Sequence, residues 1–233
     1  MSANLLPHLL ELRRRSILIL LWFAVLFTAF FFLANELFQM LVGPLLHTLS
    51  GQNDLIATQI ASPVFTPLKL AADTALLLTA PYALFHLWRF VSPGLYQKEQ
   101  RALRSAMVLS LLLFLTGVAF CYYLVLPFMF QFFIHALPKG VRYMPDMAYA
   151  LDFITRMLLL FGLCFQVPLI CLTLVRLTLL DVDTLKKIRP YVIVAAFIIG
   201  MLLTPPDVFS QIMLAVPLCL LYETGIILAV YFA

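Results

Sequence analysis

The sequence predicts an all-α membrane protein whose chain crosses the bilayer several times. Hydrophobic residues make up 64% of its 233 residues and charged residues only 11%, whereas a soluble domain has about 45–50% and about 25%. The apolar residues also gather in blocks about as long as the ~20 residues that a helix needs to cross the hydrocarbon core. Segments of alternating hydrophobicity, which are typical of a membrane β-barrel, are not found.

We expect one integral membrane domain over residues 1–233, with six spans at residues 16–38, 68–91, 105–133, 153–180, 190–204 and 208–230. The first span follows the sequence ELRRRS and has no small-residue cleavage site behind it, so we expect it to remain as a membrane anchor. The cysteines all lie in apolar stretches, which favours small buried side chains over a disulfide framework.

The middle spans contain Pro81, Pro127 and Pro168. Each proline lacks a backbone N–H and therefore predicts a kink. Two longer segments, residues 39–67 and 135–152, connect spans on the outer side. The first contains glycines and prolines among apolar residues, Pro44 among them, which predicts a folded cap that lies partly in the membrane interface.

The sequence TPPD, residues 204–207, interrupts the last apolar block and is either a kink in one helix or a turn between two. Pro205 disfavours helical geometry at Thr204, Pro206 cannot donate a helical hydrogen bond, and Asp207 is typical of a helix start. A charge inside a single span would also cost roughly 2.5–3.5 kcal/mol. We therefore predict a turn with Asp207 near the outer surface, and two short final helices. The first of these, residues 190–204, would be only about 22 Å long.

The positive charges favour one side of this arrangement. Four Lys or Arg residues fall on the side opposite the N-terminus: Lys69, Lys139, Arg142 and Arg156. Eleven fall on the N-terminal side: Arg13, Arg14, Arg15, Arg89, Lys98, Arg101, Arg104, Arg176, Lys186, Lys187 and Arg189. By the positive-inside rule the N-terminus is cytoplasmic, and six spans place the C-terminus on the same side.

Motifs for ATP hydrolysis, metalloprotease and serine hydrolase chemistry are missing from the sequence, and its histidines have no metal-ligand spacing. We expect no enzyme activity, no metal, no cofactor and no nucleic-acid partner. The informative residues are instead a few acidic and polar side chains at or within the membrane.

Two glutamates fall at the predicted cytoplasmic surface. Glu99 lies on the apolar stripe of a short surface helix predicted over residues 92–104, four residues from both Leu95 and Leu103. Glu11 precedes three arginines in the sequence HLLELRRR, residues 8–15. An intramolecular pair with an arginine, Arg14 or Arg15 in the case of Glu11, is the simpler interpretation for each. Together, two carboxylates would also suit a ligand with two guanidinium groups, each of which can form a bidentate hydrogen bond.

Three polar residues fall within predicted spans: Gln166, Gln211 and Glu223. Such residues either bond across helices or contact a ligand, and the sequence leaves both possibilities open. Asp73 follows Lys69 by four residues near the outer end of the second span, which predicts an ion pair between them.

Several motifs resemble the TatC family, the core subunit of the twin-arginine protein translocase. They are HLLELRRR, SPGLYQKEQR and KKIRPYVIVAAFIIGMLLTPPDVFSQ, and the resemblance extends through essentially the whole chain. It implies a curved arrangement of six helices with a concave face and an external cap. It also implies a receptor for folded proteins that carry twin-arginine signal peptides, which are exported across the bacterial inner membrane by the proton motive force.

The resemblance assigns roles to individual residues. Glu99 and Glu11 would bind the two arginines of the signal peptide, with Arg13 and Phe90 in matching motif positions nearby. The single-span TatA and TatB subunits would dock along the last two helices, and the complex would contain further copies of the chain. Contact positions for those subunits would be Met201, Thr204 and Gln211, whereas structural motif positions would be Pro44, Pro205, Pro206 and Asp207.

One position departs from the family. Members usually carry a glutamate where this chain has Gln166, and an amide cannot exchange a proton in the physiological range. Proton coupling through that side chain is therefore not expected here, although a polar contact would survive the change. The main alternative function is a small-solute or ion transporter whose path is lined by Gln166, Gln211 and Glu223. The sequence shows no inverted repeat that would favour it.

Overall fold

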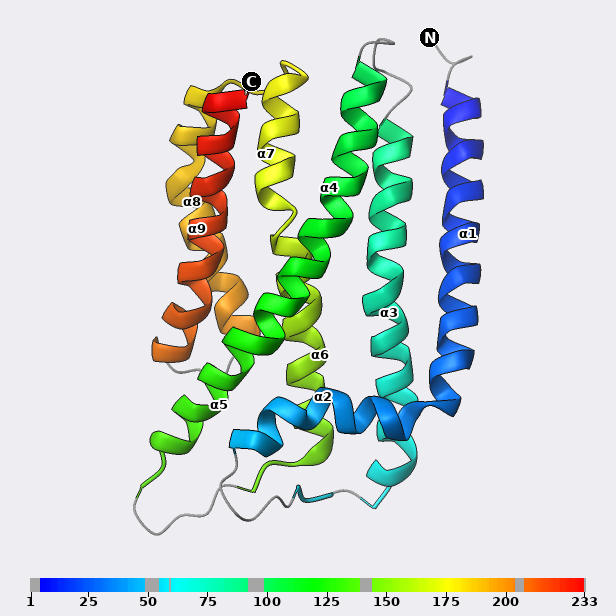
Figure 1. Ribbon diagram of the computed structural model, residues 1–233, viewed down its shortest axis with the longest axis vertical. Coiled ribbons are helices and arrows are strands. Elements are labelled where there is room, and N and C mark those ends of the chain that lie inside the picture. The colour runs from blue at the N-terminus through cyan, green and yellow to red at the C-terminus, as the bar shows by residue number, and fades with distance from the viewer. Residues whose placement is uncertain are drawn as a thin grey trace. The chain divides into compact units, whose positions relative to one another are not determined.

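The computed structural model describes residues 5–48, 55–58, 60–91, 99–138, 144–203 and 208–232, and these ranges are almost entirely helical (Figure 1). Helices are the expected outcome for apolar segments, because the hydrocarbon core offers no water to satisfy backbone N–H and C=O groups. The chain divides into two compact units. Unit 1 comprises Met1–Leu111 and Gly140–Thr155, and unit 2 comprises Leu112–Lys139 and Arg156–Ala233.

Five described helical stretches are long and apolar enough to cross a bilayer: Leu10–Phe32, Ser62–Arg89, Ser105–His135, Met147–Arg176 and Gln211–Tyr231. They coincide with five of the six predicted spans, and the remaining predicted span lies within the helix before the last. The prediction of an all-helical polytopic membrane protein is confirmed.

In unit 1, α1 (Leu5–Phe32) packs along α3 (Ser62–Val91), and α2 (Ala34–Thr48) runs across their ends (Figure 1). The first span was predicted to continue to residue 38, which is wrong, because α1 ends at Phe32 and Leu33 forms a turn. Residues 34–38 belong to α2, which buries Leu41, Val42 and Leu45 and packs on α3.

The described part of the predicted cap is folded. Pro44 is buried inside α2. A short segment after α2 is joined to the start of α6 (Met147–Cys164), because Ile56 N–H donates to Pro145 O at 3.2 Å and Met147 N–H donates to Ile56 O at 2.9 Å. These bonds connect two segments that are far apart in the sequence.

In unit 2, the end of α4 (Glu99–Phe120) approaches α6 closely. A Cβ atom on Gly117 would lie 2.6 Å from Phe161 O, so only glycine fits at this crossing. The third span continues through a π-helical segment, Cys121–Val125, into α5 (Leu126–His135). α6 ends at Cys164, and α7 (Val167–Arg176) starts after a two-residue turn, with Pro168 as its second residue. Proline is tolerated there because the first turn of a helix needs no N–H donor.

The last two helices, α8 (Val182–Leu203) and α9 (Val208–Phe232), pack against each other as an antiparallel pair. Tyr222 Oη donates to Leu185 O at 2.9 Å, whereas Gln211 Nε2 donates to Phe197 O at 2.8 Å near the other end. The prediction of two helices rather than one kinked helix is therefore confirmed, although the predicted turn, residues 204–207, lies outside the described residues.

Their lengths differ from the expectation of two short helices. α8 has 22 residues and contains Pro190 within it, so that only its part after Pro190 is short and apolar. α9 has 25 residues and is not short. A core of Cys171, Leu185, Tyr222, Ile226 and Ala229 joins α7, α8 and α9.

Candidate functional site

The start of α1 and the end of α3 form a charged site within unit 1. Arg15 uses both terminal nitrogens of its guanidinium: Nη2 forms an ion pair with Glu11 Oε1 one helical turn earlier, and Nη1 donates to His86 O on α3 at 2.7 Å. The pairing of Glu11 with Arg15 is one of the two that the sequence spacing predicted. The bond to His86 was not predicted, because its acceptor is a backbone carbonyl far along the chain.

A pocket of about 220 Å³ lies beside this ion pair. It is lined by Glu11, Arg14, Arg15, Leu18, His86 and Arg89. Glu11 is therefore at a surface where guanidinium groups gather, and its side chain is 37% exposed. Arg13 is exposed on α1 and is not part of the pocket lining.

The structure describes the backbone of Phe90 and Glu99 but not their side chains. Phe90 lies in the last turn of α3, next to Arg89 of the pocket. Glu99 is the first residue of α4, the helix that follows α3 in the chain. Seven residues, 92–98, separate Val91 at the end of α3 from Glu99 in the sequence.

Gln166 lies in the turn between α6 and α7 and is only 2% exposed. Its backbone N–H donates to Leu163 O at 3.0 Å, and its carbonyl accepts from Ile170 N–H at 2.9 Å. The break in the helix therefore leaves no unsatisfied backbone group at this residue, and its side chain is enclosed by protein.

The other two intramembrane polar residues have partners within unit 2. Arg189 Nη2 on α8 donates to Glu223 Oε2 on α9 at 2.7 Å, and the amide of Gln211 bonds to Phe197 O. Both side chains therefore connect α8 to α9. Cross-helix bonding, one of the two possibilities left open by the sequence, accounts for Glu223 and Gln211.

The structure describes some of the remaining predicted positions but not others. Met201 is 58% exposed on α8, as a contact position for another helix would be. Pro44 is buried in the cap, in agreement with a structural role. The other predicted positions lie outside the described residues: Thr204, Pro205, Pro206 and Asp207.

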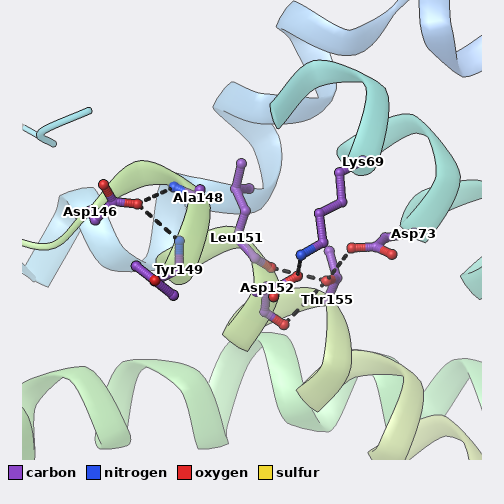
Figure 2. A network of polar contacts seen from close by, with 8 residues as sticks. All are labelled: Lys69, Asp73, Asp146, Ala148, Tyr149, Leu151, Asp152 and Thr155. Carbon is purple, nitrogen blue, oxygen red and sulfur yellow. Dashed lines mark hydrogen bonds and ion pairs between the residues drawn. The ribbon is translucent and has the colours of Figure 1, made fainter. Parts of the chain in front are cut away.

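A second polar network, which the sequence largely missed, joins α3 to α6 through residues of unit 1 (Figure 2). Lys69 Nζ lies 2.5 Å from Asp152 Oδ1, and Thr155 Oγ1 donates to Asp73 Oδ2 at 3.0 Å. The sequence spacing indicated Asp73 as the partner of Lys69 and gave no signal for Asp152.

Asp146 is the acceptor at the centre of the cap. Its Oδ2 accepts from the hydroxyl and the backbone N–H of Thr58 at 2.6 and 2.9 Å. Its Oδ1 accepts from Ala148 N–H at 2.8 Å (Figure 2). The hydrogen bonds from Thr58 hold the pKa of Asp146 below its usual range. Asp146 therefore acts as the N-cap of α6 and also attaches the segment around Thr58 to it.

Comparisons with known proteins bear on this arrangement. The model of the family Sec-independent protein translocase protein (TatC) matches residues 7–217. The Sec-independent protein translocase protein TatC of Haemophilus influenzae is 42% identical over 231 residues, which cover 99% of this chain and 90% of that protein. The TatC protein of Escherichia coli strain K12 is 40% identical over 225 residues, which cover 97% and 87%.

Solved structures give the same result. The crystal structure of the twin-arginine translocase receptor TatC superimposes with a TM-score of 0.88 at 31% sequence identity, and the match covers 96% of this chain and 98% of that one. A second structure of that receptor, in the detergent DDM, gives a TM-score of 0.86. The fold, the family model and the near full-length relatives agree that this multi-pass membrane protein, which is not an enzyme, belongs to the TatC family of Sec-independent protein translocase proteins.

Proposed function

We propose that the chain is the receptor and core scaffold of a twin-arginine translocation system. It binds the twin-arginine signal peptides of folded proteins at the cytoplasmic face of the bacterial inner membrane. Together with TatA and TatB subunits and further copies of itself, it supports export driven by the proton motive force. Membership of the TatC family, in which a solved member is described as the twin-arginine translocase receptor, supports this function.

The ion pair between Glu11 and Arg15 is the observation that carries the binding proposal. The Glu11 carboxylate already accepts a hydrogen bond from a guanidinium, and its side chain is exposed enough to be reached from solution. An arginine of a signal peptide offers the same group, with the same planar donor geometry. In this proposal it replaces Arg15 on Glu11, and Arg15 keeps its bond to His86 O.

Glu99 binds the second arginine of the signal peptide in this proposal. Its position at the first residue of α4 supports the role, because it lies at the same end of α3 as the Glu11 pocket. A carboxylate in the first turn of a helix is also stabilised in its ionised form by the helix dipole. Phe90 and Arg13 contribute to the surrounding surface.

The distribution of basic residues supports the orientation. Arg13, Arg14, Arg15 and Arg89 all lie at the end of unit 1 where α1 begins, whereas Lys69 lies at the other end of α3. The positive-inside rule places the first of these ends in the cytoplasm. With α8 and α9 as an antiparallel pair that completes six crossings, the C-terminus lies on the cytoplasmic side as well in this proposal.

The exposed face of α8 supports docking of a single-span partner. Met201 and Leu202 are both largely exposed near the end of α8, where its apolar part is short. We place TatA or TatB contacts at Met201, Thr204 and Gln211. One N–H of the Gln211 side chain is already bonded to Phe197 O. Gln211 can therefore contact a partner only through the rest of its amide group.

The test is binding of a signal peptide with paired arginines, beside its paired-lysine version, to the purified full chain in detergent. We expect the arginine peptide to bind more tightly, because lysine keeps the charge but lacks the bidentate fork. Glu99→Gln and Glu11→Gln should each remove most of this preference. Glu36→Gln is the matched control, because Glu36 is an exposed glutamate on α2, away from the pocket. Equal binding of both peptides to the unchanged chain, or an unchanged preference in Glu99→Gln, would refute the receptor site.

A further inference from the structure

The pocket between α1 and α3 has features that the proposed signal-peptide site does not use. Among the residues that line it, Glu11 is the one that contacts the signal peptide in that proposal. The lining also contains three arginines, Arg14, Arg15 and Arg89, against the single carboxylate of Glu11. The pocket is therefore cationic even after Glu11 and Arg15 have neutralised each other.

The two arginines other than Arg15 have no carboxylate partner among the described side chains. Among the residues that the structure describes, no ion pair involves Arg14 or Arg89. Both side chains are exposed at the edge of the pocket, one from α1 and the other from α3. Two guanidinium groups that face one cavity from different helices repel each other unless an anion lies between them.

His86 provides an independent indication of a ligand. Its side chain is 8% exposed, and it lines the pocket. Its Nδ1 atom is enclosed and has no hydrogen-bond partner within the described part of the chain. The ring packs edge to face against Tyr82, with 4.5 Å between ring centroids. A buried polar atom without a partner is unfavourable, and in native proteins such an atom usually bonds to an ordered water, an ion or a ligand.

We propose that this pocket binds the phosphate of an anionic phospholipid headgroup. Arg14 and Arg89 hold the phosphate oxygens from two sides, and a shift of the enclosed His86 ring toward the pocket lets Nδ1–H donate a further hydrogen bond. Arginine suits this role because its planar donors match phosphate geometry, and basic pockets between transmembrane helices on the cytoplasmic side are a known form of headgroup site.

The surroundings favour a lipid over a soluble phosphate compound. Leu18 forms the apolar part of the lining, and one turn further along α1 the side chains of Leu21 and Trp22 are exposed. An acyl chain attached to the bound phosphate would therefore continue along an apolar helix surface. The volume of about 220 Å³ is also smaller than the roughly 300 Å³ at which sites for larger organic ligands begin.

The experiment measures lipid retention by native mass spectrometry on the purified full chain in a neutral detergent. Phosphatidylglycerol and phosphatidylcholine are added separately, and inorganic phosphate is added as a competitor. We expect several-fold more bound phosphatidylglycerol than phosphatidylcholine, and displacement of the lipid by inorganic phosphate. The double variant Arg14→Gln/Arg89→Gln should lose this preference, and His86→Leu should weaken it. His86→Gln, which restores a side-chain N–H, should recover part of it.

The matched control is Arg176→Gln/Lys187→Gln, which removes two basic residues outside the pocket and leaves the total charge equal to that of the test variant. Both double variants change exposed residues only, so their folding can be compared by thermal unfolding. Equal loss of phosphatidylglycerol in the two double variants would show general charge attraction and overturn the site. Tight binding of inorganic phosphate with no preference among lipids would overturn the headgroup assignment. Because none of these variants changes Glu99, Glu11, Arg13 or Phe90, failure here leaves the signal-peptide proposal intact.

Discussion

Arg189 of α8 and Glu223 of α9 form an ion pair, with 2.7 Å between Nη2 and Oε2. Both side chains are 42% exposed within the isolated chain, and Glu223 lies within the apolar stretch Gln211–Tyr231. Two opposite charges can lie at this depth because each neutralises the other. The pair also determines which turn of α8 faces which turn of α9. The hydrogen bond from Tyr222 Oη to Leu185 O fits the same alignment of the two helices.

Removing one partner of this pair should lower the free energy of unfolding more than removing both partners. Glu223→Ala leaves the Arg189 guanidinium without its counter-charge, and we expect a loss of about 1–2 kcal/mol in the free energy of unfolding. The double variant Arg189→Leu/Glu223→Leu should stay within about 1 kcal/mol of the unchanged chain, because apolar residues suit the bilayer. Unfolding titrations in detergent measure both. Asp183→Asn is the control, since its pair with Lys186 is exposed and long at 3.5 Å, and it should have almost no effect.

The crossing of α4 and α6 should not accept a methyl group. In Gly117→Ala the new Cβ would lie 2.6 Å from the backbone oxygen of Phe161, and a backbone atom in a helix cannot move away without displacing that helix. We expect a loss of about 1–3 kcal/mol, which is the usual cost of overpacking. Gly200→Ala is the comparison, because its nearest neighbour, at 3.1 Å, is Cγ of the Gln211 side chain. Similar melting temperatures for the two variants would contradict this account of the crossing.

Acid should loosen the external cap through Asp146. Its pKa is held low in the folded chain, mainly by the hydroxyl and then by the backbone N–H of Thr58. A lowered pKa means that the stabilisation is complete above the unfolded pKa, about 3.9, and is lost as the pH falls through the lower folded value. We expect the melting temperature to drop below about pH 4. Asp146→Asn keeps an oxygen for the N-cap but replaces the Oδ2 acceptor of the two Thr58 bonds by an NH2 group. It should therefore be less stable at neutral pH by about 1 kcal/mol and should lack this acid-dependent part.

Thr58→Val provides the matched variant for the cap. It removes the hydroxyl that contributes most to the low pKa but leaves the Asp146 carboxylate and its bonds to α6 in place. Its acid transition should therefore begin at the same pH, which the unfolded pKa sets, but end at a higher pH and be smaller than in the unchanged chain. An identical pH dependence in all three proteins would mean that Asp146 does not control the cap.

What could be predicted from the sequence was the local part of this structure. The apolar blocks indicate the spans because their length matches the bilayer, and the sequence TPPD separates α8 from α9 through backbone chemistry that acts over a few residues. The pair of Glu11 and Arg15 was predictable for the same reason, since residues four apart share a helix face.

The long-range contacts were not predictable. The end of α1 at Phe32 has no proline or glycine to mark it, and the turn at Leu33 exists because α2 packs its apolar face on α3. The partners of Lys69 and Glu223 depend on which turns of two helices lie side by side. A charged residue in a span indicates that a partner is needed, but only the packed helices determine which residue it is.

A substitution of Arg15 measures how much this one side chain contributes to the contact between α1 and α3. Its two terminal nitrogens donate to different acceptors, Glu11 Oε1 and His86 O. A lysine has a single nitrogen, which cannot occupy both donor positions of the guanidinium. We expect Arg15→Lys to lower the free energy of unfolding by about 1–2 kcal/mol, as for loss of a hydrogen bond that involves a charged group. The adjacent change Arg14→Lys is the control, because Arg14 is exposed and the structure shows no such bond for it among the described residues. If both variants unfolded at the same temperature, Arg15 would contribute only charge at this surface, and the contact between α1 and α3 would depend on their apolar side chains alone.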